Sequence, residues 1–408
     1  MTTAEQAPTV DAAQPRIIGV LSIAQVVGGV GNGAVLSVGA LLIKDVSGSS
    51  AWAGMATVML TLGAAAVTMP LARLAAARGR RPSLALSWFL AGLGALVGVL
   101  GAVTEALPLV LLSLALSGAG SAAQLQSRFA AVDRAAPHQV GRALSLVVWS
   151  TAVGAVIGPN LTGPGASLAR TVGVPDLAGP LLFATAGFVL AGAVTTVLLR
   201  PDPLAGRAVE VGRRAGMREA LPLLRGTTAA AVTVIATTNA ALVAVMSLTP
   251  IHMQDHGSNL STIGVAISLC IAGMFGLSPL MGWATDILGP VRVIFAGQLL
   301  LLMGVLMAGS SGDSALRIVV GLVLLGIGWS ASVIAGATLL TSTLAVADRP
   351  TVQGFSDLAM NLAGAAGGLV AGLVVAASGF GTLNAVAALL AVPAIAVVLM
   401  TRQRPAVV

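Results

Sequence analysis

The sequence predicts an all-α membrane protein whose twelve transmembrane helices form two pseudo-symmetric six-helix bundles. Its composition, the positions of its basic residues and an internal repeat carry this prediction. Of the 408 residues, 57% are apolar and 9% are charged. A water-soluble chain of this composition would have too little polar surface to cover itself. We therefore expect the bilayer to be its solvent.

Twelve apolar stretches are long enough to cross a membrane. A helix rises about 1.5 Å per residue and the hydrocarbon layer is about 30 Å thick, so a span needs about 20 residues. The predicted spans are 17–43, 51–72, 83–103, 107–130, 141–165, 178–199, 226–250, 259–283, 291–310, 315–341, 354–378 and 381–401.

The basic residues orient these spans. Of the 21 arginine and lysine residues, all but Lys44, Arg170 and Arg317 lie in segments that must share one compartment. By the positive-inside rule these segments and both termini are cytoplasmic, which indicates a multi-pass protein of the cell inner membrane. The net charge of +7 then reflects topology and requires no nucleic-acid partner.

An internal repeat divides the chain into halves. Asn32 matches Asn239 at an offset of 207 residues, Gly79 matches Gly289 at 210, and Gly154 matches Gly367 at 213. We therefore expect a disordered cytoplasmic tail (1–15), a six-helix bundle (16–200), a cytoplasmic linker (201–224) and a second six-helix bundle (225–402).

In transporters built from such repeats, the substrate binds near the midplane between the halves. Asn32 and Asn239, which occupy equivalent places in the first and seventh spans, are the candidate polar groups of that site. An interhelical hydrogen bond is the alternative role for each.

The segment Gly282-Trp-Ala-Thr-Asp-Ile-Leu-Gly289 resembles the loop motif of the major facilitator superfamily, and the first-half copy keeps Gly79, Arg80 and Arg81. The resemblance implies a secondary transporter that works by alternating access. It also implies that the loop acid of each half docks on the other half and holds the cytoplasmic side closed.

We expect a gate from this resemblance. Asp286 would meet Arg142 at the start of span five. Because Ala76 replaces the first-half acid, we expect Asp357 in span eleven to supply the second ion pair. Its candidate partners are Arg73, Arg80 and Arg81.

Span five carries Gly154, Gly158, Pro159 and Gly163, which resemble the glycine-proline motif of proton-coupled drug antiporters. Close helix packing and a bend explain these residues equally well. Leu114 stands where such antiporters usually carry arginine, and the middle third of every predicted span lacks a carboxylate. A proton relay therefore has no obvious residue.

The stretch from Asn239 to Met281 resembles a branch of the superfamily that imports copper for haem-copper oxidase assembly, through T-P-x-H-M and G-M-F-x-x-S-P. The resemblance implies a copper site at Met246, Cys270 and Met274. Thiolate and thioether ligands select Cu(I).

In the same branch, histidines at the outer mouth would collect the cation, and here these are His252 and His256. Two positions depart from the branch pattern, because Leu242 replaces a methionine and Cys270 replaces a histidine. Packing is the alternative role for a single buried thiol.

A small organic solute, riboflavin-like or drug-like, is the alternative cargo, since the wider branch includes riboflavin importers. Trp88 and Trp149 are then candidates to stack on a flat substrate. A receptor or assembly factor that only uses this fold is a third possibility. Flux measured in proteoliposomes separates it from both transporters.

The sequence gives no support for an enzyme. It lacks a nucleotide-binding GxxxxGK[ST] segment and a His/Asp/Ser constellation, and we expect no cofactor. Its only cysteine, Cys270, excludes an internal disulfide. The expected partners are a small solute or a copper ion and the lipid bilayer, with the chain acting as a monomer.

Overall fold

The computed structural model describes residues 13–48, 55–205, 217–258, 260–312 and 314–402, and its regular elements there are helices. In this part of the chain, eleven helices are long and apolar enough to cross a membrane. The last of them, α15 (Arg349–Arg402), contains predicted spans eleven and twelve, which are separated at Gly379 by a non-helical φ of 83°. The predicted twelve-helix fold in two six-helix bundles is confirmed.

The first bundle consists of α1 (Gln14–Ser47), α2 (Met55–Arg78), α3 (Arg80–Val103), α4 (Leu107–Ala130), α5 (Val140–Asn160), α6 (Thr162–Val172) and α7 (Gly179–Leu198). The second follows the short α9 (Met217–Ala220) and consists of α10 (Thr227–Asp255), α11 (Leu260–Ile271), the π-helical turn η5 (Ala272–Gly276), α12 (Ser278–Leu288), α13 (Pro290–Gly309), α14 (Ala315–Thr343) and α15.

The described helices differ from the predicted spans at two places. Helix α1 begins at Gln14, inside the expected tail, because the Gln14 side chain is buried and its Nε2 donates to the Ala131 carbonyl at 2.6 Å. Predicted span five divides after Asn160 into α5 and the short α6. The other residues of the expected tail, 1–12, and residues 206–216 of the expected linker lie outside the described residues.

The turn glycines of the repeat have the same conformation in both halves. Gly79 precedes α3 with a φ of 96°, and Gly289 precedes α13 with a φ of 86°. Side chains with a Cβ rarely adopt this left-handed region, so both turns favour glycine. The backbone of the two turns therefore agrees with the offset seen in the sequence.

Large apolar side chains fill the bundles and also cover their outside. Trp88 and Phe188 are fully buried and stack in the first bundle with ring centroids 6.1 Å apart. Leu36, Leu369 and Leu373 are 61%, 67% and 73% exposed. Apolar surface of this kind suits contact with lipid rather than with water.

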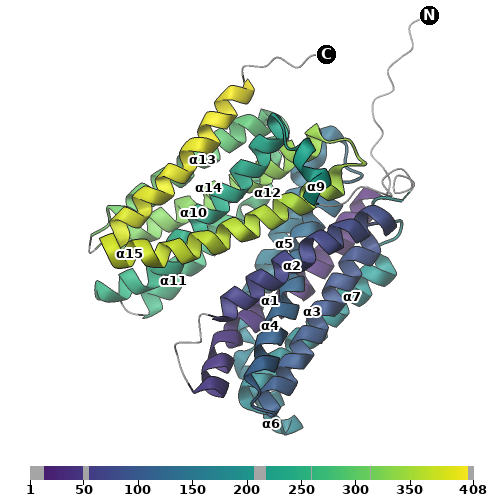
Figure 1. Cartoon of the computed structure of the whole chain (residues 1–408), viewed down its shortest axis with the longest axis vertical. Helices are drawn as coiled ribbons and strands as arrows, with labels where there is room; N and C mark the ends of the chain where they lie inside the picture. The colour runs from purple at the N-terminus through teal and green to yellow at the C-terminus, as the bar shows by residue number, and fades with distance from the viewer. Residues whose placement is uncertain (1–12, 49–54, 206–216, 259, 313, 403–408) are drawn as a thin grey trace, which may run out of the picture.

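The two bundles meet mainly through two helix pairs, α2 with α15 and α5 with α12 (Figure 1). The backbones approach so closely that a Cβ on Gly354 would lie 2.5 Å from the Cβ of Ala72, and one on Gly141 would lie 2.5 Å from the Gly282 carbonyl oxygen. These contacts lie at the end of the molecule that carries the arginine-rich loops around residues 73–81 and 130–142, which we call the basic end.

Candidate gate and transport site

A buried ion pair joins the two bundles near the basic end. Nη2 of Arg128, in the last turn of α4, lies 2.6 Å from Oδ1 of Asp357 in α15. The two side chains are 3% and 1% exposed. Arg128 also lies 4.9 Å from the ring centroid of Phe129 and donates to the Met360 sulfur at 3.7 Å. Because both charges are buried, loss of one partner would leave the other charge unpaired at a high free-energy cost.

The expected partners of Asp357, which were Arg73, Arg80 and Arg81, were wrong. Among the described residues its ion pair is with Arg128, and Arg80 pairs with Asp133. The physical reason is the register along α15, because Arg128 reaches Asp357 from α4 while Arg80 meets the same helix one turn earlier, at Gln353. Sequence reasoning missed Arg128 as a functional residue. The available signal was its place inside predicted span four, where a charge is costly unless it is paired.

Arg80 forms a second buried link between the bundles. Its Nε lies 2.8 Å from Oδ2 of Asp133, just beyond α4, and its Nη2 donates to Oε1 of Gln353 in α15. Gln353 in turn donates from Nε2 to Thr341 Oγ1 of α14 at 3.3 Å. The guanidinium of Arg80 therefore connects α3 of the first bundle to two helices of the second.

Asp286 caps a helix of the opposite bundle. Its carboxylate accepts hydrogen bonds from the backbone N–H groups of Gly141 at 2.7 Å and Arg142 at 2.9 Å, at the start of α5. The Arg142 side chain is 50% exposed, and its Nε lies 3.9 Å from the carboxylate. The stronger interaction is therefore with the positive end of the helix rather than with the guanidinium.

The two asparagines of the repeat have different surroundings. Asn239 joins three helices, because its Oδ1 accepts from Trp329 Nε1 of α14 at 3.1 Å and its Nδ2 donates to the Met360 carbonyl of α15 at 3.0 Å. Asn32 is 7% exposed, its Oδ1 packs against Gly120 of α4, and its buried Nδ2 has no hydrogen-bond partner among the described residues.

The π-helical turn η5 lies beside the Asn239 cluster. It contains Phe275, whose ring meets Trp329 edge-on with centroids 5.7 Å apart. It is followed by Ser278, whose hydroxyl donates to the Phe275 carbonyl at 2.6 Å and lies 3.2 Å from the Ser145 carbonyl of the other bundle. Single π-helical turns inside α-helices occur frequently at functional sites.

The sulfur-bearing residues belong to the core of the second bundle. Cys270 is fully buried, and a Cβ on Gly326 of α14 would lie 2.4 Å from its carbonyl oxygen. Met274 is 9% exposed within η5, and Met246 packs against the same core from α10. Cys270 lies in α11, which packs chiefly against α14 and less against α10, the helix that carries Met246.

The outer histidines are held by aromatic contacts. The rings of His252 and Phe380 stack with centroids 4.2 Å apart, and the rings of His252 and His256 lie 4.1 Å apart. In the described part of the chain, no group of three or more His, Cys, Asp and Glu side chains is placed to hold a metal ion.

The glycines of span five form a close contact between α1 and α5. A Cβ on Gly154 would lie 2.6 Å from the Gly29 Cα, and one on Gly158 would lie 2.6 Å from the Gly33 Cα. Gly163 has no such neighbour within 4 Å, and Pro159 occupies the last turn of α5. The packing interpretation of Gly154 and Gly158 therefore has direct support.

The candidate stacking residues, Trp88 and Trp149, have opposite environments. Trp88 lies within the first bundle, where a Cβ on Gly28 would be 2.4 Å from its ring. Trp149 is 44% exposed on α5, on the same face as the exposed Leu146 and Val156. This face is apolar along its length, as expected for a lipid-facing surface.

The sequence matches the Major Facilitator Superfamily over residues 21–277 and again over residues 229–408. It is 36% identical over 398 residues to an uncharacterized MFS-type transporter, YdeG, of Bacillus subtilis, with 95% of this chain and 92% of that protein covered. It is 29% identical over 382 residues to the riboflavin transporter RfnT of Brucella anthropi, covering 90% and 91% of the two chains.

The fold is similar to that of the E. coli fucose:proton symporter FucP, with a TM-score of 0.74, 17% sequence identity and 95% and 98% of the two chains covered. This structural similarity concerns the fold.

Proposed function

We propose, from the premise that this chain belongs to the Major Facilitator Superfamily, that it carries a small organic solute across the membrane by alternating access. The Arg128–Asp357 ion pair is the observation that carries the proposal. It joins the two bundles in a buried contact, and the bundles cannot separate at the basic end without breaking it. A transporter needs such a contact, strong in one state and absent in the other.

The gate in this proposal has three parts. Arg128 with Asp357, Arg80 with Gln353, and Asp286 with the start of α5 all close the basic end. Arg73, Arg81 and Arg142 contribute positive charge at the same end. In this proposal, the conformation of the protein is the one closed at the basic end.

We place the basic end in the cytoplasm, by the positive-inside rule. The protein would then lie in the inner membrane with both termini in the cytoplasm, a bundle on each side of the 201–224 linker, and its cavity open to the outside. Single cysteines tested with a membrane-impermeant reagent would establish this orientation. The only native cysteine, Cys270, is buried and adds little background.

An organic cargo is favoured over copper. The similarity to a riboflavin transporter covers 90% of this chain and gives a direct first probe. Cys270 faces the interior of its own bundle, and Leu242, in place of the expected first methionine, is 3% exposed. Asn239, Trp329 and Phe275 place an amide and two aromatic rings together in the second bundle. This set suits a polar heteroaromatic solute if Asn239 exchanges one of its two protein hydrogen bonds for a bond to the solute.

Uptake assays test this function. Cells and proteoliposomes containing the protein would be given radiolabelled riboflavin, radioactive copper and a panel of cationic dyes. We expect uptake of an organic probe that is lost in Asp357→Asn and Arg128→Gln and retained in Arg292→Gln. The exposed guanidinium of Arg292 donates to the Leu288 carbonyl at the end of α12, within the same bundle. Copper uptake that requires Cys270 and Met274 would overturn the organic-solute proposal. Folded protein with no flux of any probe would favour a receptor role.

A further inference from the structure

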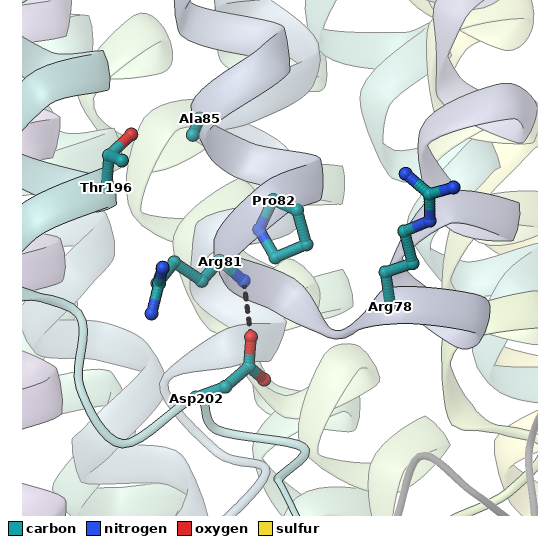
Figure 2. A pocket seen from close by; sticks show the side chains of 6 residues that line it. All are labelled: Arg78, Arg81, Pro82, Ala85, Thr196 and Asp202. Carbon is teal, nitrogen blue, oxygen red and sulfur yellow. Dashed lines mark hydrogen bonds between the residues drawn. The ribbon is translucent and has the colours of Figure 1, made fainter.

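A pocket of about 370 Å³ opens at the basic end of the first bundle. It lies where α2, α3, α7 and the segment after α7 meet, and α3 and α7 pack mainly on other helices of the first bundle. The residues that line it are Arg78, Arg81, Pro82, Ala85, Thr196 and Asp202 (Figure 2). The pocket lining thus contains none of the residues that join the two bundles, although Asp202 accepts a hydrogen bond from the backbone of Arg80.

The charges in this pocket are unbalanced. The Asp202 carboxylate accepts hydrogen bonds from the backbone N–H groups of Arg80 at 3.1 Å, Arg81 at 2.8 Å and Leu204 at 2.8 Å. Its negative charge is thus held by the N-terminus of α3.

The guanidinium groups of Arg78 and Arg81 make no ion pair or hydrogen bond with another side chain in the described residues. Figure 2 shows the two side chains on opposite sides of Pro82, with Arg81 on the side of Thr196. Two guanidinium groups without acidic partners, beside one pocket, match an anionic ligand. Phosphate oxygens are the acceptors that arginine binds with fork geometry.

An apolar surface continues from the pocket along the two helices. On α3, Leu86, Phe89 and Leu93 are 51%, 40% and 52% exposed, and on α7 Leu190 and Val197 are 52% and 60% exposed. The Phe89 ring covers Gly192 of α7, where a Cβ would lie 2.8 Å from it, so this seam between the helices is closed. The surface leads from the charged end of α3 into the span.

We propose that this pocket binds the phosphate of an acidic phospholipid. Arg78 and Arg81 hold the headgroup, and an acyl chain lies along the exposed residues of α3 and α7. A soluble phosphate compound would use the two arginines but would leave the apolar surface without a partner. A lipid uses both, and basic residues at the membrane surface attract acidic headgroups. The inference is independent of the transported solute.

The test measures lipid binding to purified full-length protein with phosphatidylglycerol, phosphatidylcholine and inorganic phosphate as probes. Native mass spectrometry would count the retained lipids, and spin-labelled phosphatidylglycerol would report binding in bilayers. We expect a preference for phosphatidylglycerol that falls about tenfold in the double variant Arg78→Gln/Arg81→Gln, because two headgroup contacts are lost. Arg78→Lys/Arg81→Lys should keep most of the preference and guards against a folding defect in the first variant.

Arg292→Gln is the matched control, since Arg292 lies in the equivalent turn of the second bundle and carries the same charge. An unchanged preference in the glutamine double variant would overturn the proposal, as would an equal loss in Arg292→Gln. Complete displacement of the lipid by inorganic phosphate would assign the pocket to a soluble phosphate compound and would overturn the lipid assignment.

Discussion

Arg128 and Asp357 are 229 positions apart in the sequence, yet Nη2 of one lies 2.6 Å from Oδ1 of the other in a contact almost without solvent exposure. The pair ties α4 of the first bundle to α15 of the second. Arg128 Nε and Asp357 Oδ2 have no hydrogen-bond partner among the described residues, so the two charges depend chiefly on each other. Loss of either partner would therefore leave a buried charge without compensation at the contact between the bundles.

Removal of one partner should open the basic end. Arg128→Gln or Asp357→Asn changes only one member of the pair, and losses of about 3–5 kcal/mol are typical when one partner of a buried ion pair is removed. We expect faster labelling of a cysteine at the buried Ala143 position, introduced by Ala143→Cys in a Cys270→Ala background. The exchange Arg128→Asp/Asp357→Arg should recover part of the protection. Labelling rates equal to those of the parent would contradict the gate assignment.

At the second contact, the helix cap should matter more than the ion pair. Asp286→Asn weakens the two hydrogen bonds that the side chain accepts from backbone N–H groups at the start of α5. We expect this to destabilise the closed state by about 1 kcal/mol. Arg142→Gln removes a half-exposed guanidinium at 3.9 Å, where a change of about 0.5 kcal/mol or less is typical. The same cysteine labelling compares the two variants. An effect of Arg142→Gln as large as that of Asp286→Asn would show that the side-chain pair dominates.

The α1–α5 contact should reject a single methyl group at Gly158, whereas Gly163, which lies in α6 outside this contact, should accept one. Gly158→Ala places a Cβ against the Gly33 backbone and should destabilise the protein by about 1–3 kcal/mol through overpacking. A Cβ at Gly163 would enter open space. Gly163→Ala should therefore leave the stability of the protein unchanged, or raise it by about 0.5–1 kcal/mol because alanine favours the helix. Thermal unfolding in detergent measures both. Equal melting temperatures would mean that α5 shifts readily along α1.

Substitutions of Cys270 separate packing from copper binding. Serine nearly matches the volume of cysteine. If Cys270 serves packing alone, Cys270→Ser should lower the stability of the protein by about 1 kcal/mol and leave uptake unchanged. Histidine is larger and brings polar nitrogens into the buried core of the second bundle, so Cys270→His should fold poorly. A copper site predicts the reverse order, with uptake kept by histidine and lost with serine. Melting temperature and uptake, measured on the same preparations, decide between the two.

Much of the fold follows from interactions of each segment with its solvent. A span of about 20 apolar residues is helical in lipid because its backbone must satisfy its own hydrogen bonds. The glycines at 79 and 289 mark turns because a positive φ favours glycine wherever the rest of the chain lies. Asp286 was also correctly expected near Arg142, because a family motif fixes its place relative to the start of α5.

The partners of buried side chains depend instead on how each helix is rotated and which helix packs against it. The sequence by itself determined the spans, the turns, the repeat and the basic end, since these need only local composition and the surrounding lipid or water. Only the tertiary structure decided that Asp357 meets Arg128, that Cys270 is buried in the core of the second bundle and that Asn239 joins three helices. A rotation of one residue along a helix turns a side chain by about 100°, and packing of the assembled bundles selects among those rotations.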